Sequence, residues 1–130
     1  MTMPAKLPHN QVYARISRSK INGVGVKAIR PIKKGKYIFQ GDNDDLIWVS
    51  RNKISKLPSE IKKLNIDFAI FKDGQFGCPV SFNLLTPAWY LNHSKRPNVG
   101  CDSKYNFFAL RNIKKGEELT VDYDTYSEQL

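Results

Sequence analysis

The sequence predicts a mainly-β, loop-rich single domain, and three observations lead to that fold class. Several short segments alternate apolar and polar residues with a period of two, which is the pattern of half-buried strands. Few segments carry helix signals, and the strand–helix–strand spacing of a parallel α/β sheet is missing. The chain has 130 residues, a length typical of one domain.

The first expected strands lie near the amino terminus. The segment 12–17 alternates, a turn follows at 19–23, and the alternation resumes at 24–28. Pro31 to Gly35 ends that strand. We expect further strands at 36–39 and 46–49, on either side of a turn at 41–45.

The rest of the chain adds two short helices and four strands. Pro58 and Ser59 are start signals for a helix over 59–64. The segments 68–71 and 75–78 flank Asp73-Gly74, which predicts a hairpin. Thr86-Pro87 supplies an N-cap and a first helical proline, so a short helix is expected over 88–91. The last strands are expected at 105–110 and 117–121.

One stretch of sequence occurs twice. Ala28-Ile-Arg-Pro-Ile-Lys-Lys-Gly35 returns 81 residues later as Ala109-Leu-Arg-Asn-Ile-Lys-Lys-Gly116. Two copies are too few for a solenoid, and a shared turn would not explain the matching Ala, aliphatic and Arg positions. We therefore expect two similar strand–turn–strand units packed in one fold.

The charge is concentrated in the first third of the chain. The formal net charge is +9, and residues 1–41 hold nine Lys and Arg with no Asp or Glu, whereas the remaining twelve basic residues balance the twelve acidic ones. Such a field favours an acidic partner, either nucleic acid or an acidic protein face. The alternative is a solvated basic surface that keeps the protein soluble.

Targeting and cysteine signals are sparse. The sequence has no apolar run near the roughly 20 residues of a membrane span, and its amino terminus lacks the apolar stretch of a signal peptide. We expect a soluble intracellular protein with no membrane partner. Cys78 and Cys101 are too few for a disulfide scaffold or a four-thiolate zinc site. Two free buried thiols are expected, and the alternative is a single disulfide between them.

Most standard catalytic constellations are missing. Gly23-Val24-Gly25 is not followed by the Gly-Lys-Ser/Thr of a phosphate loop. His9 and His93 are 84 residues apart, which is not the spacing of a metal-binding pair, and no metal is expected. Two polar clusters remain, one over 90–98 and one over 116–123. Taken separately, they are typical of a surface turn and of an edge strand.

Taken together, three segments resemble the SET-domain family of protein-lysine methyltransferases. They are Asn22-Gly-Val-Gly-Val-Lys-Ala28, Leu91-Asn-His-Ser-x-x-Pro-Asn98 and Gly116-Glu-Glu-Leu-Thr-x-Asp-Tyr123. Their order and spacing match the family over residues 12–124. The resemblance implies a β-clip of several small sheets with a few short helices. It also implies a knot-like threading that brings the second and third segments together.

The resemblance also implies a cofactor and a site. The family binds S-adenosylmethionine, whose methionyl end would meet backbone groups of the glycine loop. Tyr123 would lie beside the reacting methyl group as the catalytic residue. The implied cofactor-binding residues are Gly23, Val24, Gly25, Asn92, His93 and Tyr123. The target lysine would enter a narrow channel, with Tyr90, Val121 and Tyr126 as its expected wall residues.

The chain departs from the family pattern at its end, because it has no cysteine-rich zinc segment to close the lysine channel. We expect Tyr126 of the tail, or the partner subunit of a homodimer, to complete the site. The expected division is an amino-terminal segment 1–11, a SET domain over 12–124 with an insert at about 42–86, and a tail over 125–130.

The implied function is methyl transfer from S-adenosylmethionine to a lysine amine of a protein substrate, a histone or another protein. Two alternatives stay open. One is a SET-fold binding module without catalysis, and the other is a small basic nucleic-acid-binding β-protein. The second lacks the aromatic residues interleaved with Lys and Arg that stacking platforms use.

Overall fold

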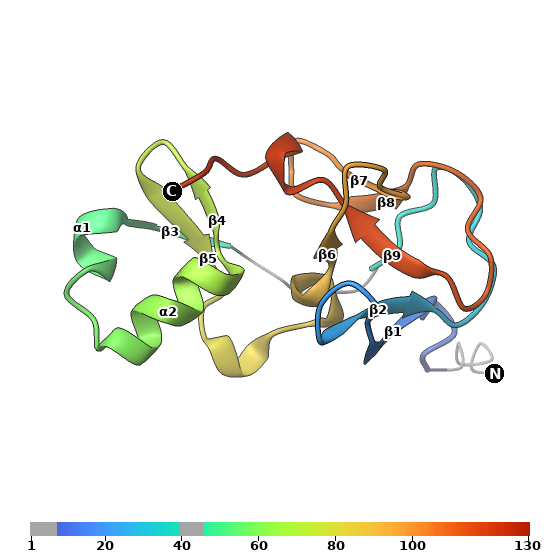
Figure 1. The fold of residues 1–130 in the computed structure, drawn as a ribbon, viewed down its shortest axis with the longest axis horizontal. Coiled ribbons are helices and arrows are strands. Elements are labelled where there is room, and N and C mark those ends of the chain that lie inside the picture. The colour runs from blue at the N-terminus through green and yellow to red at the C-terminus, as the bar shows by residue number, and fades with distance from the viewer. Residues whose placement is uncertain (1–7, 40–45) are drawn as a thin grey trace, which may run out of the picture.

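A computed structural model describes residues 8–39 and 46–130, and two sheets lie at opposite ends of the molecule (Figure 1). The larger sheet has six strands in the order β1-β2-β9-β7-β8, with β6 pairing to β9. Its strands are β1 (Ala14–Arg18), β2 (Val24–Ala28), β6 (Asn92–His93), β7 (Val99–Cys101), β8 (Phe107–Ala109) and β9 (Glu118–Val121).

The smaller sheet has the order β3-β5-β4 and carries the two α-helices. Its strands are β3 (Ile47–Ser50), β4 (Ile70–Lys72) and β5 (Gln75–Cys78). The helices are α1 (Arg51–Ile54) and α2 (Ser59–Phe68), and the described residues also form three 3₁₀ turns: η1 (Phe82–Leu84), η2 (Pro87–Tyr90) and η3 (Tyr123–Thr125). Within the described ranges, no helix is long and apolar enough to cross a membrane.

The mainly-β prediction is confirmed, and most expected elements are present. β2 and β5 span the expected residues, and the β4–β5 hairpin turns at Asp73-Gly74. β1 begins at Ala14 rather than at 12, because the Val12 N–H donates to the His9 carbonyl in a preceding turn (3.1 Å). The helix expected over 59–64 continues to Phe68 as α2.

The strand expected at 36–39 is wrong. Tyr37 makes a single bridge to Phe108, and the chain then bends. The reason is that Ile38 and Phe39 both pack against the same core, whereas successive side chains of a strand point to opposite faces. The turn expected at 41–45 lies outside the described residues.

Other boundaries also moved. β8 begins at Phe107 rather than at 105, since Tyr105 has φ 63° and leaves the extended region. α1, β6 and β7 were not expected from the sequence. Cys78 and Cys101 are free thiols, but only Cys78 is buried. Burial, together with Asp102, raises the pKa of Cys101 to about 12.

The repeated stretches form two similar turns that pack in one fold and pair with each other, although the first unit lacks the strand expected after its turn. Ile32 and Ile113 exchange both backbone hydrogen bonds (2.9 and 2.8 Å). The N–H of Gly35 donates to Ala109 and that of Gly116 donates to Ala28, both at 2.8 Å. Each bond therefore has a counterpart 81 residues away, which relates the two turns by an approximate twofold axis. Ile32 and Ile113 are 1% and 2% exposed, so their pairing lies in the core.

β9, which belongs to the third motif segment, packs in this core. Leu119 and Val121 are fully buried, and β9 pairs antiparallel to β2 and parallel to β6. The second and third motif segments therefore lie side by side. After η3 the tail runs towards β4 of the smaller sheet (Figure 1), where the Glu128 N–H donates to the Phe71 carbonyl (2.7 Å). The expected division into segments, domain and insert stays a prediction.

Candidate active site

The Asn92 side chain connects the three motif segments. Asn92 is only 7% exposed, and its Nδ2 lies within hydrogen-bond distance of the carbonyls of Val24 (3.1 Å) and Asn22 (3.3 Å). The same nitrogen is 3.0 Å from Glu118 Oε2 and 2.9 Å from Ser19 Oγ. β6, the glycine loop and β9 therefore meet at one buried amide.

A carboxylate and a hydroxyl complete this cluster. The Ser19 hydroxyl donates to Glu118 (2.7 Å to Oε2), and its oxygen accepts the backbone N–H of Ile21 (2.9 Å). Ser19 thereby ties the turn before β2 to β9. Neither Ser19 nor Glu118 was singled out from the sequence, because the contact spans 99 residues. We call Ser19, Asn92 and Glu118 the polar hub.

Gly25 explains why the loop comes so close to this hub. A Cβ at position 25 would lie 2.5 Å from Glu118 Oε2 and 2.8 Å from Asn92 Nδ2. Both distances are shorter than any ordinary contact, and both atoms are held by hydrogen bonds. Gly23 has φ +44° and open space around its Cβ position, so it supplies the turn and leaves the backbone accessible. The polar hub thus contacts the loop at Gly25, whereas the space around Gly23 stays open.

Asn98 is a second buried amide that aligns the motif segments. It is 3% exposed, its Nδ2 donates to the Glu118 carbonyl (2.8 Å), and its Oδ1 accepts the Thr120 N–H (2.8 Å). The Asn98 side chain therefore makes two hydrogen bonds to the β9 backbone of the kind that a neighbouring strand would otherwise make. Asn98, which the sequence alone classifies as a turn residue, positions the strand that leads to Tyr123.

Tyr123 lies directly beside His93 and Leu91. Its hydroxyl donates to the Leu91 carbonyl (2.5 Å), and its backbone N–H donates to His93 Nδ1 (3.1 Å). The His93 and Tyr123 ring centroids are 5.1 Å apart. The Tyr123 residue is 40% exposed, yet desolvation of its hydroxyl raises the pKa of Tyr123 above its ordinary value. The hydroxyl is therefore a protonated donor at neutral pH.

These residues open onto a cavity of about 1130 Å³. Its walls come from the end of α2, β4, the Tyr105–Phe107 region and the tail, with His93, Tyr123 and Tyr126 among the lining residues. Aromatic and charged side chains both line it, and Tyr126 packs edge-on against Phe107 (5.6 Å) and Tyr123 (6.3 Å). Burial, with a smaller contribution from Tyr123, raises the pKa of Tyr126. Tyr126 is thus a wall of the cavity next to Tyr123.

The other expected site residues lie outside this cavity. Val121 is fully buried in the core, and Tyr90 packs edge-on against Phe68 with its ring centroid 5.4 Å away. Of the described residues that line the cavity, none belongs to the Gly23–Gly25 loop. The structure therefore groups Tyr123, Tyr126 and His93 at the cavity and Gly25 with Asn92 at the hub. The channel role of Tyr90 and Val121 stays a prediction.

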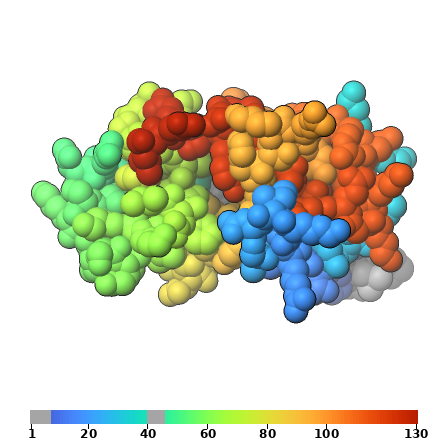
Figure 2. All heavy atoms as spheres, viewed as in Figure 1, coloured from blue at the N-terminus to red at the C-terminus, as the bar shows by residue number. Residues whose placement is uncertain are grey.

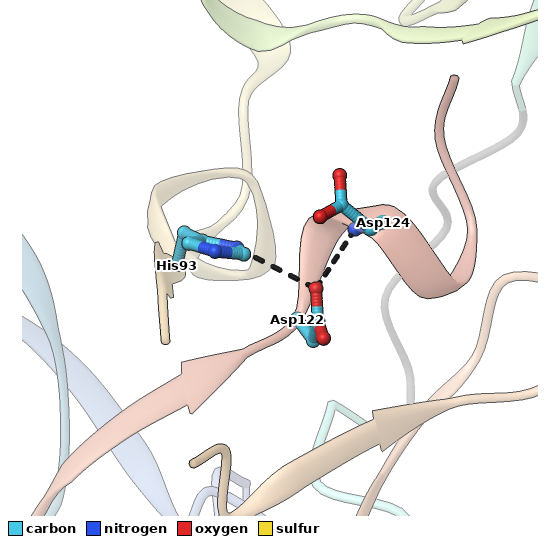
Figure 3. Close-up of side chains that lie close together, drawn as sticks. All are labelled: His93, Asp122 and Asp124. Atoms are coloured by element: carbon cyan, nitrogen blue, oxygen red, sulfur yellow. Dashed lines mark hydrogen bonds and ion pairs between the residues drawn. The ribbon is translucent and has the colours of Figure 1, made fainter. Parts of the chain in front are cut away.

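Three potential metal ligands lie close together (Figure 3), and two of them, His93 and Asp124, line the cavity. Ligand atoms of His93, Asp122 and Asp124 lie within 4.8 Å of one another. The Lys95 ammonium pairs with both carboxylates, at 3.5 Å from Asp122 and closer to Asp124. Lys95 holds the pKa of the Asp124 carboxyl below its usual range. The single charge of Lys95 therefore offsets one of the two negative charges.

The tail is anchored by residues that no sequence pattern had singled out. The Phe71 N–H donates to Ser127 Oγ and the Asp73 N–H donates to Glu128 Oε1, each at 3.0 Å. Trp48 was also missed; its indole packs onto Gly77, where a Cβ would lie 2.8 Å from the ring. The tail bonds join the smaller sheet to the carboxyl-terminal wall of the cavity, and the Trp48 ring also packs 5.7 Å from that of Tyr105 in another wall segment. Only the fold brings these residues together.

A Gly25→Ala substitution tests the close approach at the hub. The added methyl must displace Glu118 or Asn92, so we expect a loss of about 1–3 kcal/mol in the free energy of unfolding, measured by urea denaturation. Gly100→Ala is the control, because its Cβ would meet the movable ends of Leu110 and Phe108. An equal or smaller loss for Gly25→Ala would contradict the hub geometry.

Comparisons with known proteins agree with this arrangement. The chain is 34% identical over 122 residues to the histone-lysine N-methyltransferase trr of Drosophila melanogaster, covering 88% of this chain and 5% of the relative. It is 30% identical over 129 residues to an H3 lysine-36-specific histone-lysine N-methyltransferase of Debaryomyces hansenii, covering 90% of this chain and 17% of the relative. The chain thus spans a small part of the curated relatives it matches.

Solved structures share the fold at low identity. The Neurospora SET domain protein DIM-5, a histone lysine methyltransferase, matches with a TM-score of 0.57 at 21% identity, over 90% of this chain and 54% of that one. A Chaetomium thermophilum Polycomb Repressive Complex 2 chain matches with a TM-score of 0.62 at 16% identity, over 91% of this chain and 16% of that one. The SET domain family model matches residues 23–124. The chain therefore belongs to the SET-domain family.

Proposed function

We propose that this chain transfers a methyl group from S-adenosylmethionine to the side-chain amine of a lysine in a protein substrate. The observation that carries the proposal is Tyr123, whose hydroxyl and its Leu91 carbonyl partner form a polar point in an aromatic cavity. Membership of the SET-domain family and the names of the relatives support the same reaction class.

The glycine loop and the polar hub suit the proposed cofactor. Gly23 leaves the backbone of its loop open to a ligand, and Asn92 holds that backbone in place from the other side. His93, next to Asn92 on β6, has its Nδ1 occupied by the Tyr123 N–H, which fixes the ring between hub and cavity. S-adenosylmethionine, when bound, supplies a methyl group on a positively charged sulfur. Gly23, Val24, Gly25, Asn92 and His93 are the residues proposed to hold it.

Tyr123 and its neighbours position the reacting groups. The lysine amine must be neutral to act as a nucleophile. Desolvation by the aromatic rings beside Tyr123 lowers the pKa of an amine, whereas the acidic side chains elsewhere in the cavity wall raise it and favour entry of the charged form. Because burial raises the pKa of Tyr123, its hydroxyl stays protonated and acts as a fixed dipole rather than as a base. Holding nucleophile, methyl carbon and leaving atom in line is proximity catalysis, worth up to about 7–11 kcal/mol in favourable cases.

The tail supports completion of the cavity within one chain. Tyr126 packs between Phe107 and Tyr123, and the following Ser127 and Glu128 bond to the smaller sheet. This arrangement supports the expectation that Tyr126 of the tail completes the site within one chain. Completion by the partner subunit of a homodimer stays a prediction. A closed wall next to Tyr123 would keep water from the reacting centre.

The binding-module alternative predicts cofactor binding without methyl transfer. The experiment that separates it from catalysis is a transfer assay with methyl-labelled S-adenosylmethionine on protein mixtures, in which mass spectrometry locates the modified residue. Label on lysine supports the proposal, and cofactor binding with no labelled protein supports the binding module.

The Tyr123→Phe substitution tests the role of the hydroxyl. We expect turnover to fall by about 100-fold or more with cofactor affinity near that of the wild type, because the hydroxyl acts mainly in the transition state. Tyr13→Phe is the matched control, since that ring lies under Arg30 and Lys36 and away from the cavity. Turnover of Tyr123→Phe within about twofold of the wild type would rule out this assignment.

Stepwise shortening tests the tail. Ending the chain after Asp124 removes Tyr126 and both anchors to the smaller sheet, so we expect methyl transfer to be lost while the fold and most cofactor affinity remain. Ending it after Glu128 keeps Tyr126 and the anchors, and should preserve most activity. Activity is measured at concentrations where each protein is monomeric by light scattering. Full activity of the shorter variant under those conditions would show that the tail is not needed.

A further inference from the structure

The twofold-related pairing of the repeated stretches places two Lys-Lys turns on one surface. The Lys34 N–H donates to Asn112 Oδ1 (2.9 Å), so each turn lies against the strand end of the other unit. We call this area the double-turn surface, defined by Arg30, Lys33, Lys34, Arg111, Lys114 and Lys115. Figure 2 shows the cyan and orange atoms of these two segments together at the right-hand end of the molecule.

The double-turn surface carries more positive charge than its surroundings neutralise. All six cationic residues are exposed. Glu117 pairs with Arg111 (3.0 Å) and also accepts the Lys114 N–H, and these bonds hold the pKa of its carboxyl below its usual range. Among the described residues, none of the four lysines has a carboxylate within ion-pair distance. Like charges gathered without partners favour binding of an anion with several charges.

The backbone under these lysines is fixed before any partner binds. Both turns end at a glycine with positive φ, +87° at Gly35 and +90° at Gly116, and each glycine N–H is bonded across to the other unit. Ile32 and Ile113 bury the centre of the pairing. Little backbone entropy therefore has to be lost on binding.

The charge at this end contrasts with the walls of the cavity. The charged side chains that line the cavity are acidic in the majority, with Asp67, Asp102, Asp124 and Glu128 against Lys95 and Lys104. No residue of the double-turn surface lines the cavity among the described residues. The double-turn surface would therefore attract a polyanion. This surface lies at the end of the molecule away from the smaller sheet (Figure 1), so the cavity would stay free.

The composition of the surface decides between classes of polyanion. Four of its six cations are lysines, which protein–protein interfaces disfavour, and the large apolar side chains beside it are Ile29 and Leu110, 36% and 40% exposed. The ring of Tyr13, which contacts this surface, has the Arg30 guanidinium 4.2 Å from its centroid. Among the described residues, the surface thus has no free aromatic ring, which acidic protein partners use as an anchor and single strands use for stacking.

We propose that the double-turn surface binds the phosphate backbone of duplex nucleic acid, without reading its sequence. Lysine and arginine contacts to phosphates position a protein on a duplex but carry no base information. In this arrangement the surface holds the chain on a nucleic acid while the cavity end stays free for a substrate. The proposal does not rest on the methyl-transfer assignment.

Fluorescence anisotropy with a short labelled DNA duplex of arbitrary sequence tests this. The variant carries Lys33→Gln, Lys34→Gln, Lys114→Gln and Lys115→Gln. The control carries Lys53→Gln, Lys56→Gln, Lys62→Gln and Lys72→Gln around the smaller sheet, and so loses the same net charge. We expect the variant to bind at least about tenfold more weakly at low salt, with a slope of log affinity against log salt reduced by about 3, and the control to change little.

Three outcomes would overturn the proposal: no binding of the wild type at low salt, equal weakening in variant and control, or displacement of the duplex by polyglutamate at equal charge. Circular dichroism and thermal unfolding check that both variants fold. If the fourfold variant unfolds, the pair Lys34→Gln with Lys115→Gln should give about half the change in slope. Cofactor affinity, measured by calorimetry, should be the same in all of these proteins.

Discussion

The polar hub sets the geometry on which the rest of the site depends. A single buried amide, Asn92, contacts the carbonyls of the glycine loop and the carboxylate of Glu118 within 3.3 Å, and Ser19 closes the network. Buried polar groups of this kind are costly when one partner is lost, because the others are left unpaired away from water. The hub therefore fixes the loop, β6 and β9 relative to one another.

Two strands that leave the hub, β6 and β9, position residues at the cavity. β6 places His93 and β9 leads into η3, so Tyr123 is held by its backbone bond to His93 and its hydroxyl bond to Leu91. The smaller sheet and the tail then add aromatic walls around it. The larger sheet thus positions the Tyr123 hydroxyl and the Leu91 carbonyl, whereas the smaller sheet and the tail supply aromatic rings around them.

Local patterns predicted the local parts of this structure, and distance limited the rest. The alternation of 24–28 predicts β2 because one of its faces is buried. The resemblance implied that the second and third segments meet, and Tyr123 does contact His93, whereas Asn92 lies in the hub. The 36–39 strand failed because the core takes Ile38 and Phe39 together. Ser127 was not foreseen, since its partner Phe71 is 56 residues away and no local pattern encodes such a contact.

Calorimetric titration of Asn92→Ala with S-adenosylmethionine tests the central claim most directly. If the hub shapes the cofactor site, affinity should fall by about 1–3 kcal/mol, or roughly 5- to 150-fold, in a protein that remains folded. Asn83→Ala, at an exposed position in η1, is the control and should bind as the wild type does. Unchanged affinity in folded Asn92→Ala would contradict the account, because the hub would then have a structural role only.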